Sequence, residues 1–342
     1  MAFSSYPAPE VVMERELGSS AYRCGTVAIV GRPNVGKSTL LNRFLGQKIA
    51  IVSPKPETTR DRILGILTLH EAQILFVDTP GIYRGAKTLL ARHQMKAARQ
   101  GLAEADLVLL LSDASAGWTR NDQEIVELLP RKKEVPTKGR RAAFLAINKV
   151  DRIEKGLILP QIEQASLAYP FRDIFPISAT KGDNVESLLA ALKEALPQGP
   201  ALYPPDQVTD RPLRLLAQEL IREKALLFTH EEIPHAVAVL IEEWRPGQTS
   251  TRYRDASVPG AESGSGSAPA GKTFIRATLY VERDSQKRIV IGKRGSLLKR
   301  IGEAARREIE RLLEGPVYLD VWVKVEKDWR KDPQSLKRLG YG

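Results

Sequence analysis

The sequence predicts an α/β protein in two parts, a doubly wound domain with a mostly parallel six-stranded sheet and a smaller α+β domain. Short, strongly apolar runs alternate with amphipathic helical patterns from about Thr26 to Leu196, which is typical of a sheet that helices cover on both faces. Prolines then interrupt the alternation at 197–205. After them, strands and helices are expected in a different order, which indicates a second fold.

The strands expected in the first domain are short apolar runs, as buried strands usually are. They are Thr26–Val30, Ile63–Thr68, Ala72–Val77, Leu107–Leu111, Ala142–Ile147 and Asp173–Ile177. The stretch from Ile63 to Val77 has a turn near His70, so it predicts an antiparallel edge hairpin. Helical patterns lie between the strands, at Lys37–Leu45, Leu89–Leu102, Asp122–Leu129 and Val185–Ala195.

The second domain is expected to begin with an amphipathic helix over Pro212–Leu227. Strands at His235–Glu242 and Thr273–Glu282 flank Ala261–Ala270, whose Ser, Gly and Pro content predicts a flexible hairpin tip. A helix at Ser296–Leu313 and a strand at Val317–Val325 complete the domain. We therefore divide the chain into an N-terminal extension (1–22), a first domain (23–197), a linker (198–210) and a second domain (211–342) with a flexible insertion near 249–272.

Composition argues against several classes of protein. No apolar run approaches the ~18 residues that cross a bilayer. The first twenty residues carry Glu10, Glu14 and Glu16 and lack an apolar centre, which argues against a secretory signal and a mitochondrial transit peptide. The single cysteine, Cys24, cannot form an internal disulfide, which fits a reducing compartment. The four histidines show no metal-ligand spacing.

The sharpest motif is a glycine-rich loop that fits the pattern G-x-x-x-x-G-K-[ST] between an expected strand and an expected helix. Glycines let backbone N–H groups approach phosphate oxygens, and the helix N-terminus adds a partial positive charge. Lys37 is predicted to neutralise the β- and γ-phosphates, and the Ser38 hydroxyl to bind Mg²⁺. The predicted nucleotide contacts here are Gly31, Arg32, Pro33, Asn34, Val35, Gly36, Lys37, Ser38 and Thr39.

The choice between ATP and GTP depends on Asn148-Lys149-Val150-Asp151, which follows an apolar strand. Guanine offers two donors, N1–H and the 2-amine, that the Asp151 carboxylate can accept, whereas adenine has no donor at N1. Taken alone, this tetrapeptide would favour a helix-capping turn. After a phosphate loop and at a strand end, it predicts guanine. Ser178 and Ala179 end the next strand, and backbone N–H groups there are expected to meet the guanine oxygen.

Two further segments are expected to sense the γ-phosphate. In Asp78-Thr79-Pro80-Gly81, Asp78 is placed to hold Mg²⁺ through water and Gly81 to contact the phosphate by its N–H. Thr59, within Pro56–Arg60, is expected to complete the Mg²⁺ shell beside Ser38. The expected catalytic set is Lys37, Thr59, Asp78 and Gly81. Both segments should order with GTP and relax after hydrolysis.

Ile82 follows Gly81, where many GTPases carry a water-orienting glutamine. Because isoleucine cannot hydrogen-bond a water, slow intrinsic turnover is expected. The attacking water must then be held by the backbone, by another residue or by a monovalent cation, and Asn34 is a candidate ligand for K⁺. An RNA-binding protein with little or no GTP turnover stays open as an alternative.

Basic residues gather at the end of the chain. The net charge is +11, and residues 285–342 hold 15 basic and 8 acidic side chains, a net charge of +7. A G-x-x-G loop in this region, Ile291-Gly292-Lys293-Arg294-Gly295, would let a nucleic-acid backbone approach closely while Lys293 and Arg294 contact phosphates. Trp322 and Trp329 could stack bases, although the expected strand favours a core position for Trp322.

The order GRPNVGKS, PETTR, DTPG, NKVD and ISA, followed by a GKRG-bearing domain, resembles the Era GTPases. The resemblance runs from about Gly25 to Tyr341 and includes DRPLRLLAQELIREKALLF and YLDVWVKVEKDWRKDP. It implies a P-loop GTPase domain followed by a K-homology (KH) domain that binds small-subunit ribosomal RNA near its 3′ end and assists assembly of the small ribosomal subunit. The site residues named above then contact GTP or GDP, Mg²⁺ and RNA.

The resemblance also implies a cytoplasmic location with loose peripheral association at the inner face of the cell membrane. We expect a monomer and no DNA partner. The Ser/Gly stretch Glu262–Ala270 and the basic stretch Arg131–Arg141 look additional to the family pattern. A GTPase linked to transfer-RNA modification shares the P-loop style, but the terminal G-x-x-G domain argues against it.

Overall fold

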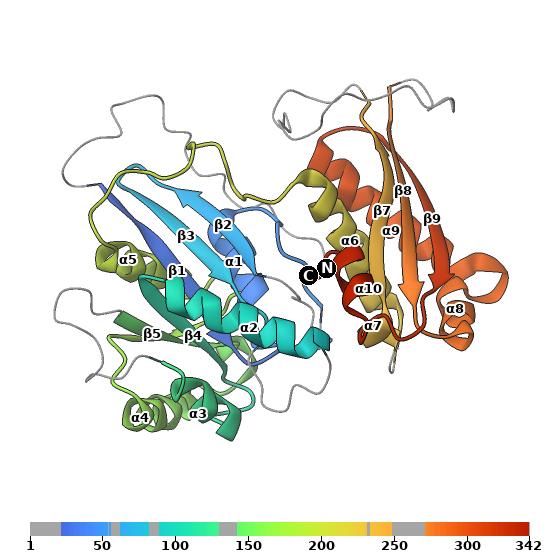
Figure 1. Cartoon of the computed structure of the whole chain (residues 1–342). Coiled ribbons are helices and arrows are strands. Elements are labelled where there is room, and N and C mark those ends of the chain that lie inside the picture. The colour runs from blue at the N-terminus through green and yellow to red at the C-terminus, as the bar shows by residue number, and fades with distance from the viewer. Residues whose placement is uncertain are drawn as a thin grey trace. The chain divides into compact units, whose positions relative to one another are not determined.

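The computed structural model describes residues 22–53, 55, 62–81, 89–129, 142–230, 233–247 and 271–341. The chain divides into two compact units with the main boundary between Asp210 and Arg211 (Figure 1). Within the described ranges, no helix combines the length and apolarity needed to span a membrane. The expectations for Pro56–Arg60, Ile82, Arg131–Arg141 and Ala261–Ala270 lie outside the described residues.

The first unit contains a six-stranded sheet in the order β2-β3-β1-β4-β5-β6. Every neighbouring pair is parallel except β2 with β3, which is antiparallel. The predicted mostly parallel sheet with an edge hairpin is therefore confirmed. The strands are β1 (Arg23–Gly31), β2 (Ile63–Thr68), β3 (Ala72–Asp78), β4 (Leu107–Asp113), β5 (Ala142–Asn148) and β6 (Ile174–Ile177).

The helices of this unit agree with the sequence pattern except at α3 and α4. They are α1 (Lys37–Leu45), α2 (Leu89–Glu104), α3 (Arg120–Val126), α4 (Ile158–Ala168) and α5 (Val185–Ala195), with short 3₁₀ turns at Val150–Arg152 and Lys155–Leu157. Helix α3 was predicted over Asp122–Leu129 and begins earlier because Thr119 and Asp122 form a capping box. Helix α4 was not predicted. Leu159 and Leu167 are exposed on this helix. Because apolar residues lie on its solvent face as well, the sequence does not show the regular apolar period by which a surface helix is recognised.

The segment predicted as a linker is bound to the first unit by regular hydrogen bonds. The Ile66 N–H of edge strand β2 donates to the carbonyl of Val208 (2.8 Å), and the Thr209 hydroxyl donates to the carbonyl of Leu64 (2.7 Å). The buried Gln73 amide accepts from the N–H of Tyr203 (3.0 Å) and donates to its carbonyl (2.8 Å). Residues 202–209 therefore follow the sheet edge instead of crossing open solvent.

The second unit has an α+β fold, as predicted. Its sheet has the order β7-β8-β9, with β7 antiparallel and β9 parallel to β8. Helices α6 and α9 pack on one face, where Ile221, Ile275 and Ile301 belong to one buried cluster. The elements are α6 (Leu213–Phe228), α7 (Ile233–Ala236), β7 (Ala238–Arg245), β8 (Thr273–Val281), α8 (Asp284–Ile291), a 3₁₀ turn (Lys293–Gly295), α9 (Ser296–Leu313), β9 (Val317–Val325) and α10 (Pro333–Arg338).

Three expectations for this unit were incomplete or wrong. The strand expected from His235 begins at Ala238, because Ile233–Ala236 forms a helical turn. The apolar run before Gly292 is the end of helix α8, which was not predicted, and neither was α10. Helices α7, α8 and α10 were not predicted because they span only 4, 8 and 6 residues, which is too short for a clear apolar period.

The two C-terminal tryptophans have environments opposite to those expected. Trp322 is 56% exposed, and its indole N–H donates to Asp320 (2.9 Å). Trp329 is fully buried, donates to the carbonyl of Ala236 (2.9 Å) and stacks on Tyr341. Alternation along β9 is the reason: Val317 and Val323 enter the core, so Trp322 lies on the opposite face.

Replacing Trp329 with alanine is expected to destabilise the second unit by about 3–5 kcal/mol, because it leaves a large cavity and an unpaired carbonyl. The matched control, Trp322→Ala, is expected to change stability by only about 0.5 kcal/mol. Hydrogen exchange of the β8 amides reports the stability of this unit separately from the first. Equal effects of the two substitutions would contradict the assigned packing.

Candidate nucleotide site and nucleic-acid interface

The phosphate loop lies between β1 and α1, and its two glycines have no room for a side chain. Gly31 and Gly36 have φ angles of +152° and +105°. A Cβ on Gly31 would lie 2.5 Å from the Leu111 carbonyl oxygen, and one on Gly36 would lie 2.2 Å from the Asn148 amide nitrogen. The backbone therefore curls closely against β4 and β5, which leaves its N–H groups to form a cradle for an anion.

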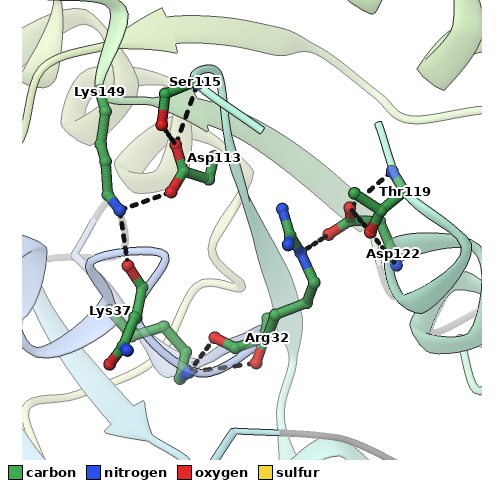
Figure 2. A network of polar contacts seen from close by, with 9 residues as sticks. Arg32, Lys37, Asp113, Ser115, Thr119, Asp122 and Lys149 are labelled. Atoms are coloured by element: carbon green, nitrogen blue, oxygen red, sulfur yellow. Dashed lines mark hydrogen bonds and ion pairs between the residues drawn. The ribbon is translucent and has the colours of Figure 1, made fainter. Parts of the chain in front are cut away.

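Lys37 is buried at the centre of this loop. Its ammonium donates to the carbonyls of Arg32 (2.9 Å) and Gly31 (3.1 Å), as Figure 2 shows. Burial lowers the pKa of Lys37 to about 8, and the nearby Asp78 carboxylate opposes that shift. A buried cation at the first turn of a helix is what a triphosphate requires of its site.

The side chains predicted to hold Mg²⁺ converge beside Lys37. The Ser38 hydroxyl donates to the buried Asp78 carboxylate (2.7 Å). Oxygen donors of this kind, a hydroxyl and a carboxylate next to a phosphate cradle, fit Mg²⁺. Gly81 lies against the loop, since a Cβ there would come 2.7 Å from the Pro33 nitrogen. Thr59, the other predicted ligand, lies outside the described residues.

Thr79 and Pro80 connect Asp78, which is predicted to hold Mg²⁺, to Gly81. Thr79 is fully buried, and its hydroxyl donates to the carbonyl of Ile29 in β1 (2.9 Å). This bond joins the end of β3 to the strand that leads into the phosphate loop. Thr79 thus fixes the path of the segment, and its hydroxyl is engaged by β1 instead of being left for a ligand. Thr39 lies in the first turn of α1.

Asn148 and Lys149 join the phosphate loop to the predicted base-recognition segments. The Asn148 amide donates to the carbonyl of Val35 (2.7 Å) and accepts from the N–H of Ala179 (2.9 Å). The Lys149 ammonium donates to the carbonyl of Asn34 (2.7 Å) and to the Asp113 carboxylate (Figure 2). Phosphate site and base site are therefore one connected structure.

Asp151 is held in place by Ser178, whose hydroxyl donates to one carboxylate oxygen (2.7 Å). This bond fixes the plane of the carboxylate that is predicted to read guanine. The N–H groups expected to meet the guanine oxygen are engaged in the protein. That of Ser178 donates to the carbonyl of Asp183 (3.1 Å), and that of Ala179 donates to Asn148.

Three residues that sequence reasoning did not single out complete the site. Asp122, fully buried, pairs with the Arg32 guanidinium (2.9 Å), so Arg32 contributes its backbone to the cradle while its side chain anchors the loop to α3 (Figure 2). Asp113 pairs with Lys149, and Arg43 binds the loop after β6. The capping box Thr119–Asp122 and the strand-end position of Asp113 were the available signals.

Asp113 is ionised in this network. Burial disfavours its charged form, but hydrogen bonds from Lys149 and Ser115 outweigh burial and lower its pKa. The Asp113 carboxylate therefore stays charged at neutral pH, and its ion pair holds Lys149 against the phosphate loop.

The predicted RNA-binding residues form one tight turn between α8 and α9. Gly292 and Gly295 have φ angles of +73° and +78°, and Arg294 between them also has a positive φ of 53°. Lys293 and Arg294 are exposed at the tip, while Ile291 packs against the core of the second unit. A Cβ on Gly292 would lie 2.9 Å from the backbone nitrogen of Leu297. The turn therefore exposes two positively charged side chains, and its glycines would let a nucleic-acid backbone approach closely.

Comparisons with known proteins agree with this arrangement. Residues 26–149 match a family described as "50S ribosome-binding GTPase", and residues 262–330 match the KH domain family. The chain is 45% identical over 326 residues to the GTPase Era of Geobacter metallireducens, which covers 95% of this chain and all of that protein.

Two solved structures are similar over nearly the whole chain. One is Era in complex with MgGDPNP and nucleotides 1506–1542 of 16S ribosomal RNA, and the other is a variant of Aquifex aeolicus Era bound to GDP·AlF₄⁻. Each is 42% identical, has a TM-score of 0.82 and matches over 94% of this chain and 99% of that chain. With both domains matched in order and the sites above in place, the chain belongs to the Era family of GTPases.

Proposed function

We propose that this protein is a GTP-hydrolysing switch that binds small-subunit ribosomal RNA near its 3′ end and assists assembly of the small ribosomal subunit. One observation carries the proposal: a glycine cradle with a buried lysine is joined, through Asn148 and the Ser178–Ala179 loop, to the Asp151 carboxylate that we expect to read guanine, on a chain that also presents a G-x-x-G turn. The full-length similarity to Era bound to MgGDPNP and 16S RNA supports it.

The chain's own groups account for phosphate binding. The loop N–H groups and the Lys37 ammonium meet the phosphate oxygens, and Lys37 gives up its carbonyl partners to do so. Ser38 and Asp78 would hold Mg²⁺, which supplies charge neutralisation when bound. Gly81 lies against the phosphate loop, where its N–H can sense the γ-phosphate.

For the attacking water we propose a K⁺-assisted arrangement in which Asn34 supplies a ligand. Asn34 lies exposed in the phosphate loop with a positive φ of 64°, and its carbonyl is held by Lys149. Phosphate release with Mg²⁺, compared in K⁺ and in Na⁺ and with RNA added, tests turnover. Absence of GTP-dependent release even with RNA and K⁺ would favour a binding protein without turnover.

The partner RNA is tested by crosslinking in cells followed by sequencing of the bound RNA. Recovery of the 3′ end of small-subunit ribosomal RNA is expected, and recovery of transfer RNA would overturn the proposal. From the family resemblance we also propose a cytoplasmic monomer with loose association at the inner face of the cell membrane. Cell fractionation and light scattering of the purified protein test these two points.

The variant Asp151→Asn is expected to weaken GTP binding by about a hundredfold, because an amide cannot accept both guanine donors. Affinity for xanthosine triphosphate is expected to rise, since the new N–H group can donate to the xanthine 2-oxygen. Titration with fluorescent nucleotides measures both, and RNA affinity serves as the control. Unchanged GTP affinity would refute the role of this carboxylate.

Nucleotide binding is expected to take up protons in the alkaline range. Because the free protein's Lys37 has a pKa of about 8, a growing fraction is neutral as the pH rises through that value, and the bound phosphates restore its proton. Affinity should therefore fall as the pH rises above about 8. Calorimetry in two buffers of different ionisation enthalpy measures the uptake, and a buffer-independent heat would contradict it.

Substitutions in the G-x-x-G turn are expected to weaken RNA binding without affecting GTP affinity. Gly292→Asp adds a negative charge and a Cβ that collides with Leu297. Arg294→Gly is a milder variant, because glycine suits the positive φ while one phosphate contact is lost. It should reduce the salt dependence of single-strand binding by a slope of about 0.7. An unchanged slope would remove the turn from the interface.

A further inference from the structure

Arg43 extends from the last turn of α1 to the loop that follows β6. Its Nε donates to the carbonyl of Ala179 (2.5 Å), and its Nη2 donates to the carbonyl of Thr180 (2.5 Å). These carbonyls belong to consecutive residues, so one planar guanidinium orients two neighbouring peptide groups. The helix that begins at the phosphate cradle therefore also holds the base-recognition loop.

The loop is shaped to close around this guanidinium. Gly182 has a φ of +97°, and a Cβ there would lie 2.7 Å from the Arg43 Nη1. Its N–H donates to the carbonyl of Ser178 (2.7 Å), which completes a tight turn. A residue with a side chain at 182 would meet both backbone strain and the arginine, so loop and arginine fit each other.

The orientation of these peptides determines where their N–H groups point. In a trans peptide the C=O and N–H point in opposite directions, so holding the carbonyl of Thr180 directs the N–H of Lys181. That N–H donates to the Ser178 hydroxyl (3.1 Å), which in turn donates to the Asp151 carboxylate (2.7 Å). Arg43 is thus connected through three hydrogen bonds to the carboxylate that is proposed to read guanine.

The carbonyl of Ala179 fixes the next N–H in the same way. It directs the N–H of Thr180 away from Arg43, and this N–H makes no hydrogen bond to any residue in the part of the chain that the structure describes. The N–H groups of Ser178 and Ala179 already have protein partners. Thr180 therefore offers the donor that remains for the oxygen at position 6 of a purine.

We infer that Arg43 is a positioning residue for recognition of 6-oxo-2-aminopurines. It fixes the Thr180 N–H for the 6-oxygen and, through Ser178, the Asp151 carboxylate for the 2-amine. The inference rests on the proposed guanine-nucleotide site and specifies how that site is held. It predicts that Arg43 controls discrimination among bases, which a residue that serves only stability would not do.

Dissociation constants for three diphosphates test this role, measured for the wild-type protein and Arg43→Met. Inosine diphosphate lacks the 2-amine, and 6-thioguanosine diphosphate replaces the 6-oxygen with a weaker acceptor. The wild-type protein is expected to prefer guanosine diphosphate over both. In Arg43→Met, the preference for guanosine diphosphate over each analogue, measured as the ratio of dissociation constants, should fall by about tenfold. The reason is that the Thr180 N–H and the Asp151 carboxylate are no longer held where guanine needs them.

Two further variants sharpen the test. Arg43→Lys keeps the charge but lacks two coplanar donors, so intermediate ratios are expected, and this milder variant serves if Arg43→Met does not fold. Lys193→Met removes a surface ion pair with Glu71 on the same unit and should leave both ratios unchanged.

Unchanged ratios in both Arg43 variants would overturn the inference, whether their affinities for all three nucleotides stay the same or weaken by one common factor. Failure of the proposed function looks different. There, the wild-type protein itself would bind adenosine diphosphate as tightly as guanosine diphosphate.

Discussion

The side-chain amide of Asn148 lies where three segments of the GTPase domain meet. It donates to the phosphate loop at Val35 and accepts from the base-recognition loop at Ala179, while its backbone ends β5. Both bonds are buried, so loss of the amide would leave an unpaired carbonyl and an unpaired N–H. The glycine at position 36 is required by the same contact, because a Cβ there would overlap the amide. This one side chain therefore joins the predicted phosphate-binding loop to the predicted base-recognition loop.

Around this centre, ion pairs connect the loops to the sheet and its helices. Asp122 on α3 holds the first half of the phosphate loop through Arg32, and Asp113 at the end of β4 holds its second half through Lys149. Arg43 holds the loop after β6 by hydrogen bonds to two of its carbonyls. The loops of the predicted nucleotide site therefore have their backbones fixed by contacts of charged side chains with the neighbouring helices and strands. In the second unit, the positive φ angles of Gly292, Arg294 and Gly295 shape the G-x-x-G turn.

Prediction from sequence succeeded where periodicity was long or a motif was specific. Helix α9 and strand β9 were predicted at their observed bounds, since an amphipathic run of 18 residues and an alternating strand leave few alternatives. Within the first unit, the described motif residues of the predicted nucleotide site converge around Asn148 and Lys37, although Thr79 and the N–H groups of Ser178 and Ala179 are engaged within the protein. Within the second unit, the G-x-x-G residues form one turn. Short helices such as α7 and α10 were missed, because one or two turns carry too little pattern. Trp322 was misjudged because the face of β9 that enters the core depends on which side the helices cover.

By itself, the sequence determined the fold class and the phosphate loop, and it located Asp151 and the G-x-x-G turn as the groups predicted to contact guanine and RNA. These are local properties, set by the backbone freedom of glycine, the apolar period and the chemistry of neighbouring residues. Only the tertiary structure decided that Arg32 turns to Asp122, that Arg43 holds the loop after β6, and that residues 202–209 bind the edge of the sheet. Each of those contacts joins residues far apart in the chain, and no local pattern reports which distant partner a side chain will meet.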